Sequence, residues 1–600
     1  MQSVRAFAGG SRYRLPGLAA FCAALLPPEA GGPDPRRLAE DVERFAWRLP
    51  PSARIMLRLG VTSVAALGRR APDQAVEALK TVVLLVAGSQ HGAVELLAWA
   101  GEMPLAQPDP ELDVTPASQW PDRSSADVVV IGSGAGGAMA ARTLARAGMR
   151  VAVVEEGRRF TATEFRSRHP LERWTELYRD AGSTMTLGTP PILLPIGRGV
   201  GGTTLVNSAT CYRPPHDVLV RWRDDHGLAL ADPDTLSPFV EDAWSTINAE
   251  PVSLDVMGRN GQLVLEGARR LGWRAAPLDH NAVQCGGCCQ SAIGCPRNAK
   301  NGVWLNALPQ ACDAGVRILT HARVERVLHE RGRATGIVAR SFRGRAIRMD
   351  APRVVIACGA TETPLLLRRS GLGRHPRVGA NLSIHPALAL LARFDEPVMG
   401  WRGVLQSAGV EAPDAHGVLM EATSAPFGMG WTAFPGRGRQ LMRELDRAEC
   451  YASLGALIAD RSSGRVYGRN RAIVRYELAP DDHDRLRNAM RSIARVLLAA
   501  GAQDVITGIE GANRVSTLEQ LDDAMTRFDH RKLHLAAFHP VGTAAAGGNP
   551  ERHAVDPTGK LRGVEGVWVA DASILPSCPE VNPQVTIKAL ALAVAHGMGS

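Results

Sequence analysis

A β-α-β pattern at residues 127–157 constrains the fold of this chain more than any other feature. It begins with an apolar run at Val128–Ile131, which is typical of a parallel strand buried on both faces. Gly132, Gly134 and Gly137 follow with the spacing G-x-G-x-x-G. Such a turn lets a pyrophosphate approach the backbone at the N-terminus of the next helix, so the pattern predicts a dinucleotide site.

The second half of this pattern narrows the choice of nucleotide. Gly148 stands where a left-handed helix cap is expected, and a second strand at Val151–Val154 ends in Glu155. A carboxylate about 20 residues beyond the glycines can accept hydrogen bonds from ribose hydroxyls, whereas an NADP site favours arginine. The sequence therefore predicts an FAD or NAD site and argues against NADP.

Length and composition exclude several other classes of protein. The 600 residues exceed one ordinary core and predict several domain-sized units. An apolar content of 45% and a charged content of 22% are globular values. The net charge of +9 is scattered and lacks interleaved aromatic residues, so we expect no nucleic-acid partner.

Two apolar segments could suggest a membrane or an export signal. Thr81–Gly101 is the longer, but polar residues interrupt it, so we expect a buried helix pair and no transmembrane segment. Arg5, Arg12 and Arg14 precede the run Gly17–Leu26 and could imitate a secretory signal. The long basic region, the missing cleavage site and the absence of a spaced cysteine framework favour a cytoplasmic protein.

Local patterns outline the rest of the chain. The first 115 residues predict amphipathic helices, for example at Pro35–Trp47. The segment Ala334–Ala357 predicts strands joined by a solvated turn, RGR, and Ala472–Leu478 predicts another strand. Asp481 is expected to cap a helix with one apolar face, which contains Leu486, Met490, Ile493 and Leu497.

Three further motifs carry a resemblance to a known family. They are PIGRGVGGTTLVN at residues 195–207, HPVGTAAAG from His539, and GVWVADASILPSCPEVNPQVTIKALA from Gly566. With the glycine turn upstream, they resemble the glucose-methanol-choline (GMC) family of FAD-dependent alcohol oxidoreductases over roughly residues 120–600. The chain is most similar to the long-chain alcohol oxidase and cholesterol oxidase branches.

The resemblance implies an α/β fold, α+β overall, with two units and an N-terminal addition. The expected FAD-binding domain is Rossmann-type and discontinuous, and comprises residues 116–215, 303–378 and 535–600. The expected substrate-binding domain, with an antiparallel sheet, comprises residues 216–302 and 379–534. Residues 1–115 form the expected helical extension.

Two residues are candidates for catalysis. His539 occupies the position of the family's base in its HPxGT motif, and histidine titrates in the range that a general base needs; a structural, hydrogen-bonded histidine is the alternative. Asn582 matches the amide that holds the substrate oxygen, or else it is a turn-forming residue before Pro583. The chain reads GTAAAG where relatives commonly read GTCRMG, which leaves the contacts on the substrate side open.

The resemblance also implies a set of cofactor contacts. Pro583 would open a helix whose N-terminal amides stabilise reduced flavin, and Val324 would touch adenine through its backbone, although a plain core role is the alternative. The complete predicted FAD-binding set is Gly132, Gly134, Gly137, Glu155, Gly201, Gly202, Asn207, Val324, Asp571 and Pro583.

The segment CGGCCQSAIGCP contains Cys285, Cys288, Cys289 and Cys295. A metal-free structural loop is the favoured interpretation, so no metal site is predicted. An iron–sulfur cluster, a zinc site and a redox disulfide are the alternatives.

The predicted function is FAD-dependent oxidation of an alcohol to an aldehyde or ketone. The expected substrate is apolar, long-chain or sterol-like, and the expected electron acceptor is O2 or another molecule. Alternatives are a dehydrogenase that passes electrons to a protein through a cysteine-bound cluster, a non-redox lyase of the same fold, and a non-catalytic flavoprotein.

Overall fold

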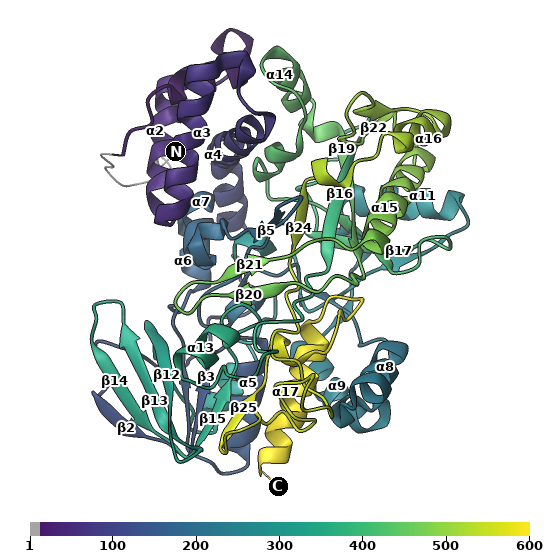
Figure 1. The fold of residues 1–600 in the computed structure, drawn as a ribbon. Helices are drawn as coiled ribbons and strands as arrows, with labels where there is room; N and C mark the ends of the chain where they lie inside the picture. Colours follow the sequence, from purple (N-terminus) through teal and green to yellow (C-terminus); the bar gives the residue numbers. More distant parts are fainter. Residues whose placement is uncertain (1–12, 600) are drawn as a thin grey trace.

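A parallel sheet forms the centre of the nucleotide-binding unit. The computed structural model describes residues 13–599. Its six parallel strands have the order β1 (Val114–Pro116), β11 (Arg317–Thr320), β4 (Val151–Val154), β3 (Val128–Ile131), β15 (Arg353–Ile356) and β25 (Val567–Val569) (Figure 1). Helices α5 (Ala135–Arg146) and α17 (Gln584–Gly599) pack against each other beside the sheet. Both predicted strands are confirmed, and Gly148, with φ 84°, follows the end of α5.

A second, larger sheet forms the other unit and confirms the expected antiparallel architecture. Its strands run in the order β23 (Arg514–Val515), β22 (Asp504–Ile506), β16 (Pro386–Arg393), β19 (Tyr451–Ile458), β18 (Val418–Thr423), β17 (Gln406–Glu411) and β9 (Arg274–Pro277). Strand β24 (Leu535–Ala537) pairs with β16 and also with β6 (Ile192–Leu193). Helices α11 (Arg259–Arg270) and α15 (Pro480–Ala499) pack against this sheet.

Three small sheets complete the fold. One consists of β12 (Ala322–Glu330), β13 (Arg333–Ser341), β14 (Ala346–Asp350) and β2 (Arg123–Ser125). Another consists of β7 (Thr210–Cys211), β10 (Asp279–His280) and β8 (Glu250–Pro251), and the third of β20 (Arg465–Tyr467), β21 (Ile473–Arg475) and β5 (Thr186–Leu187). Strand β21 confirms the strand predicted near residue 472.

The RGR turn between β13 and β14 is more than a solvated edge. The Arg345 guanidinium donates hydrogen bonds to the carbonyls of Ala117 and Trp120, both at 2.6 Å, and to the Asp122 carboxylate at 2.7 Å. The turn therefore anchors the segment that enters the nucleotide-binding unit. Its partners are more than 200 positions away, so the local pattern did not reveal them.

Helix α15 has the predicted apolar face but a different cap. Leu486, Met490, Ile493 and Leu497 are all buried. The prediction that Asp481 is the cap is wrong, because Pro480 already occupies the first helical turn and Ala479 is the N-cap. Proline suits that position because it lacks the N–H that would remain unpaired there. Asp481 instead forms an ion pair with Arg461 at 3.2 Å.

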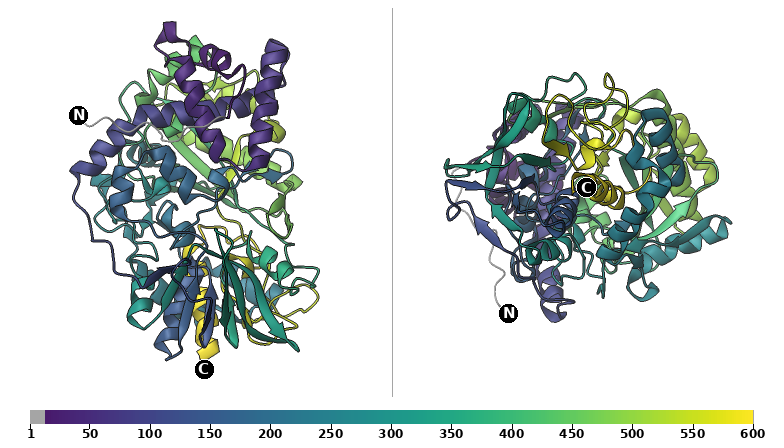
Figure 2. Two further views of the ribbon diagram at one scale, coloured as in Figure 1. Left: turned by 90° about the vertical axis from the view of Figure 1, so that its left-hand side faces the viewer. Right: turned by 90° about the horizontal axis from the view of Figure 1, so that it is seen from below.

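The N-terminal residues form a helical layer at the opposite end of the molecule from the C-terminus (Figures 1 and 2). Its helices are α1 (Leu18–Leu25), α2 (Pro35–Arg48), α3 (Pro51–Leu67) and α4 (Asp73–Glu102). Helix α2 confirms the predicted amphipathic helix, and Leu18, Cys22 and Leu25 of α1 are buried in the layer. Arg5 and Arg12 lie outside the described residues.

The predicted pair of helices near residues 81–101 is wrong, because α4 is one helix of 30 residues. The apolar run is interrupted by Ser89, Gln90 and His91. Unlike proline, these residues do not end a helix. By length and composition α4 could cross a membrane, yet half of its most apolar window is buried inside the protein.

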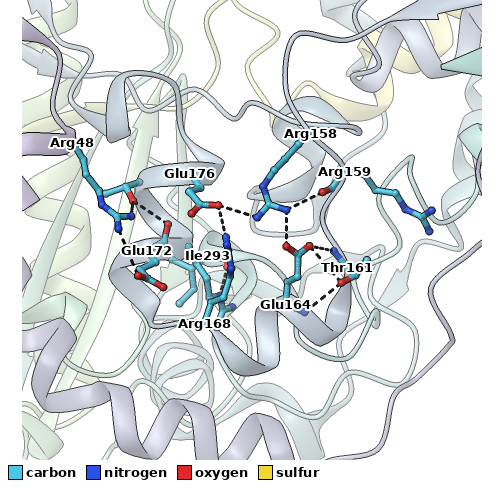
Figure 3. Close-up of polar contacts among 11 residues, drawn as sticks. Arg48, Arg158, Arg159, Thr161, Glu164, Arg168, Glu172, Glu176 and Ile293 are labelled. Atoms are coloured by element: carbon cyan, nitrogen blue, oxygen red, sulfur yellow. Dashed lines mark hydrogen bonds and ion pairs between the residues drawn. The ribbon is translucent and has the colours of Figure 1, made fainter. Parts of the chain in front are cut away.

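Ion pairs and a shared core hold the helical layer in place. Arg48 of α2 donates to Thr175 Oγ1 at 3.2 Å and lies 3.6 Å from Glu172, both on α7 (Pro170–Leu177). Beside them, Arg158 joins Glu164 of α6 (Ala162–Ser167) to Glu176 (Figure 3). The buried core of the layer also includes residues of α7 and of the large sheet, such as Leu171, Tyr451 and Ile506.

We predict that close packing of α4 limits substitution at Gly92. A Cβ atom there would lie 2.1 Å from the Phe427 carbonyl oxygen, so Gly92→Ala should destabilise the protein by about 1–3 kcal/mol through overpacking. Gly101→Ala in the same helix is the control, because nothing lies within 4 Å of its Cβ position. Thermal unfolding should show a lower Tm for Gly92→Ala only; equal Tm values would contradict the proposed contact.

Candidate functional site

Two glycine loops meet at the carboxyl end of the parallel sheet. Gly202 has φ 55°, and a Cβ atom on it would lie 2.8 Å from the Gly134 Cα atom. Gly201, with φ 107°, belongs to the same turn. A Cβ on Gly137 would lie 2.0 Å from the Gly132 carbonyl oxygen, as expected where helix α5 approaches strand β3 closely. The structure therefore brings together all five glycines predicted to bind the cofactor.

The loop with Gly132, Gly134 and Gly137 and the loop with Gly201 and Gly202 together form a cradle. The N-terminus of α5 in this cradle is open to an anion. Its N-cap residue, Gly134, provides no side-chain hydrogen bond. The first amides of a helix have no acceptor within the helix, and the helix dipole favours negative charge at this end. A pyrophosphate fits these donors.

Glu155 braces the glycine turn. Its buried carboxylate accepts hydrogen bonds from Ser133 N at 3.1 Å, Ser133 Oγ at 2.7 Å and Gly157 N at 2.8 Å. Burial and the neighbouring Glu156 raise the pKa of Glu155. A carboxylate has about four acceptor positions, so one remains for a ribose hydroxyl, and that contact stays a prediction.

Asp571 links two loops of the same edge. It accepts hydrogen bonds from Gly359 N at 2.8 Å, Thr363 Oγ1 at 2.6 Å and Ser573 N at 2.7 Å. These contacts join the loop after β15 to the loop after β25. Asp571 therefore shapes the cradle whether or not it also touches the cofactor.

Val324 lies in strand β12, opposite Ala339, and its side chain is buried. Its carbonyl oxygen accepts a hydrogen bond from Arg369 at 3.1 Å. Two residues earlier, Ala322 N donates to the Glu155 carbonyl at 3.2 Å, so the strand adjoins the cradle. The adenine contact stays a prediction beside the core role.

The start of α17 is tied to the second glycine loop. Asn207 Nδ2 donates to Gln584 Oε1 at 3.2 Å, and buried Lys588 donates to the same oxygen at 2.8 Å. Pro583 stands directly before α17, and its carbonyl accepts from Ile587 N, which confirms the predicted start of the helix. Burial lowers the pKa of Lys588 to about 8.

Sequence analysis missed Gln584 and Lys588. Their spacing of four places both on one face of a helix, which was the available indication.

His539 faces a second histidine. The Nδ1 atoms of His539 and His385 are 3.1 Å apart, so one ring donates and the other accepts. When His539 donates, its Nε2 carries no proton and is free to take one. His539 follows β24 and His385 precedes β16, and pairing of these strands places the two rings together.

Asp460 holds the backbone at His385. Its carboxylate accepts from Ser383 Oγ at 2.7 Å, Ile384 N at 3.1 Å and His385 N at 3.2 Å. His385 itself has φ 58°, a conformation that these contacts support. The sequence carried a visible indication, since His385-Pro386 repeats the His-Pro pair at residues 539–540.

Both imidazoles are uncharged at neutral pH. Burial lowers the pKa of His539 to about 4 and, together with the other ring, lowers the pKa of His385 well below its ordinary value. A neutral imidazole can accept a proton, whereas an imidazolium cannot. The pair is therefore in the form that can accept a proton, but a pKa of about 4 makes His539 a weaker base than the near-neutral histidine that the sequence predicts.

Asn582 is oriented by a buried acid on the large sheet. Its Nδ2 donates to Glu421 Oε1 at 3.1 Å, and Gln406 donates to the other carboxylate oxygen at 2.7 Å. Burial raises the pKa of Glu421 to about 7, although these hydrogen bonds oppose the rise. One Asn582 N–H remains available to a ligand. Sequence analysis missed Glu421, an acid inside the apolar strand VLMEAT.

Among the cofactor-binding and catalytic candidates and their partners, three buried polar side-chain atoms have no hydrogen-bond partner. They are Asn207 Oδ1, His385 Nε2 and Asn582 Oδ1. Buried polar atoms are normally paired, so such atoms indicate where a ligand belongs. The cradle and the catalytic candidates thus both have unpaired polar atoms that could bind a ligand.

The cysteine segment is held by buried cations. Arg173 donates to the carbonyls of Ile293 at 2.7 Å and Gly294 at 2.5 Å, and Lys300 donates to the Ser291 carbonyl at 2.8 Å. All ten cysteines are free thiols. Within residues 13–599, no group of three or more His, Cys, Asp or Glu residues is arranged to hold a metal ion. The metal-free loop stays a prediction.

We predict that Glu421 makes stability depend on pH. Its folded pKa of about 7 exceeds the ordinary 4.5, so the folded state binds more protons between these values and the contribution of Glu421 is lost as pH rises through 7. Glu421→Gln should therefore raise stability more at pH 8 than at pH 5, by at most about 3 kcal/mol. Thermal unfolding at both pH values, with exposed Glu411→Gln as control, tests this; an equal effect at both would contradict it.

Comparisons with known proteins identify the family. Models of the GMC oxidoreductase family match residues 174–387 and 460–591, and an FAD binding domain model matches residues 127–168. An uncharacterized GMC-type oxidoreductase of Mycobacterium tuberculosis (strain H37Rv) is 55% identical over 96% of both chains. A long-chain-alcohol oxidase of Arabidopsis thaliana is 28% identical over 79% of this chain and 68% of its own.

Solved structures show the same fold. Pyridoxine 4-oxidase from Mesorbium loti has a TM-score of 0.60 at 19% identity, and the match covers 78% of this chain and 98% of that one. The model of the FAD binding domain spans the glycine turn and Glu155, and the cradle has the open helix end that FAD requires. This chain belongs to the GMC oxidoreductase family, and its cofactor is FAD.

Proposed function

We propose that this protein oxidises an apolar alcohol, long-chain or sterol-like, to the aldehyde or ketone. The neutral histidine pair carries this proposal, because it leaves His539 Nε2 free to take a proton. The similarity to long-chain-alcohol oxidases of Arabidopsis thaliana supports the substrate class. Bound FAD supplies the acceptor for the hydride, and O2 or another molecule then accepts the electrons.

Each of these side chains has its own role in the proposed reaction. His539 Nε2 removes the hydroxyl proton, and His385 fixes the ring from its Nδ1 side. Asn582 donates its remaining N–H to the substrate oxygen, while Glu421 holds the amide plane. Positioning of this kind lowers the barrier by fixing the reacting carbon before the bond breaks.

We expect His539→Ala to retain FAD and to slow flavin reduction by a factor on the order of 100, the range for loss of a general base. Asn582→Ala should also slow reduction while sparing FAD affinity. Anaerobic mixing with a panel of alcohols, followed by bleaching of the flavin spectrum, measures both. His534→Ala is the control, because His534 is exposed and stands five positions before His539 in the sequence.

Two outcomes would count against the proposal. Near-normal reduction in both variants would remove His539 and Asn582 from the mechanism. If no alcohol bleaches the wild-type flavin, the protein would instead be a non-redox lyase or a flavoprotein with another role.

The two glycine loops allow a separate test of cofactor binding. The Cβ of Gly134→Ala would make only an ordinary contact, 3.7 Å from Gly202 Cα, so the apoprotein should keep its stability within ~0.5 kcal/mol. FAD affinity should fall by roughly tenfold or more, which is about 1.4 kcal/mol, because the pyrophosphate approaches there. Gly202→Ala should lower both quantities, since its own backbone is crowded.

Titration of apoprotein with FAD and thermal unfolding of the same samples separate the two effects. Unchanged FAD affinity in Gly134→Ala would show that the phosphate does not contact this turn.

A further inference from the structure

Helix α3 exposes an apolar stripe at the surface of the helical layer. The side chains of Ile55, Met56 and Leu59 are 60%, 68% and 59% exposed, and Leu67 at the end of the helix is 49% exposed. Ile55 and Leu59 lie one turn apart on the same face. Single exposed aliphatic residues are common, but a row of large ones marks a surface that binds something.

The charged residues of α3 itself have one sign. The helix contains Arg54 and Arg58 but no aspartate or glutamate, whereas Arg44 and Arg48 before it pair with carboxylates. Arg58 borders the stripe and forms no ion pair with a described residue. Arg54 lies 4.7 Å over the ring of Trp47, which is itself 57% exposed. Arginine beside exposed tryptophan and aliphatic residues is the composition of helices that lie in a lipid interface.

A second basic element adjoins the start of α3. Arg471, in the loop between β20 and β21, donates to Ser52 Oγ at 2.5 Å. Residues 461–475, which include this hairpin, contain five arginines and no acid. Arg461 and Arg471 pair with Asp481 and Asp180, whereas the other three arginines form no ion pair with a described residue. Tyr467 and Ile473 of the hairpin are 43% and 50% exposed. The basic and apolar surface therefore continues from α3 onto this hairpin.

We propose that α3 and the β20–β21 hairpin dock the protein on an anionic lipid surface. In this arrangement the α3 stripe enters the boundary between head groups and acyl chains, and the arginines contact lipid phosphates. A second copy of this chain is a poorer partner for α3, because a symmetric contact between two copies would bring arginines against arginines. The proposal does not depend on the identity of the alcohol substrate.

The test uses FAD-loaded, full-length protein and sedimentation with lipid vesicles. Wild-type protein should bind vesicles of phosphatidylcholine with phosphatidylglycerol and should bind pure phosphatidylcholine at least tenfold less. Added salt should weaken binding, because it screens the charges. The double variant Ile55→Glu, Leu59→Glu should bind the anionic vesicles at least tenfold less than wild type.

Leu254→Glu is the matched control, since Leu254 is 59% exposed in a different unit and should leave binding unchanged. The flavin spectrum and Tm of each variant show that the fold is intact. Equal binding by wild type and double variant would overturn the proposal, as would a wild-type dimer that the double variant converts to monomer.

Discussion

The backbone contact between the two glycine loops is the constraint on which the cofactor site depends. Gly202 approaches Gly134 so closely that a single added carbon would lie 2.8 Å from its Cα atom. This contact aligns the loop after β3 with the loop that leads to Asn207 and, through Gln584, with the start of α17. The contact therefore links the predicted phosphate-binding end of the cradle to the end where catalysis is proposed.

Buried cations extend this organisation across the molecule. Lys300 donates to the carbonyls of Leu205, Asn207 and Ser291, which joins the second glycine loop to the cysteine segment. Burial lowers the pKa of Lys300 to about 7, whereas hydrogen bonds to the three carbonyls favour its charged form. The same segment reaches helix α4 through Gln290, whose Nε2 donates to the Leu96 carbonyl. The helical layer is thus connected to the cofactor loop through the cysteine segment.

The catalytic candidates depend on the large sheet for their orientation. Pairing of β24 with β16 brings His539 to His385, and Glu421 on β18 fixes the amide of Asn582. His385 and Glu421 are buried and His539 is partly buried, and burial moves the pKa of each of these three groups toward the uncharged form. A neutral base beside a fixed amide suits removal of a proton from an alcohol. Elsewhere on the molecule, the exposed apolar residues and arginines of α3 suit contact with lipid.

The sequence by itself determined the strands, turns and helix faces that depend only on neighbouring residues. The strands at Val128–Ile131 and Val151–Val154, the glycine turn and the apolar face of α15 follow from the spacing of neighbouring residues. Only the tertiary structure decided which side chains meet. His385 and Glu421 lie 154 and 161 positions from their partners, and the anchoring of Arg345 spans more than 200. A local pattern can indicate a residue, as the repeated His-Pro pair does for His385, but not its partner, because contacts between distant segments create such pairs.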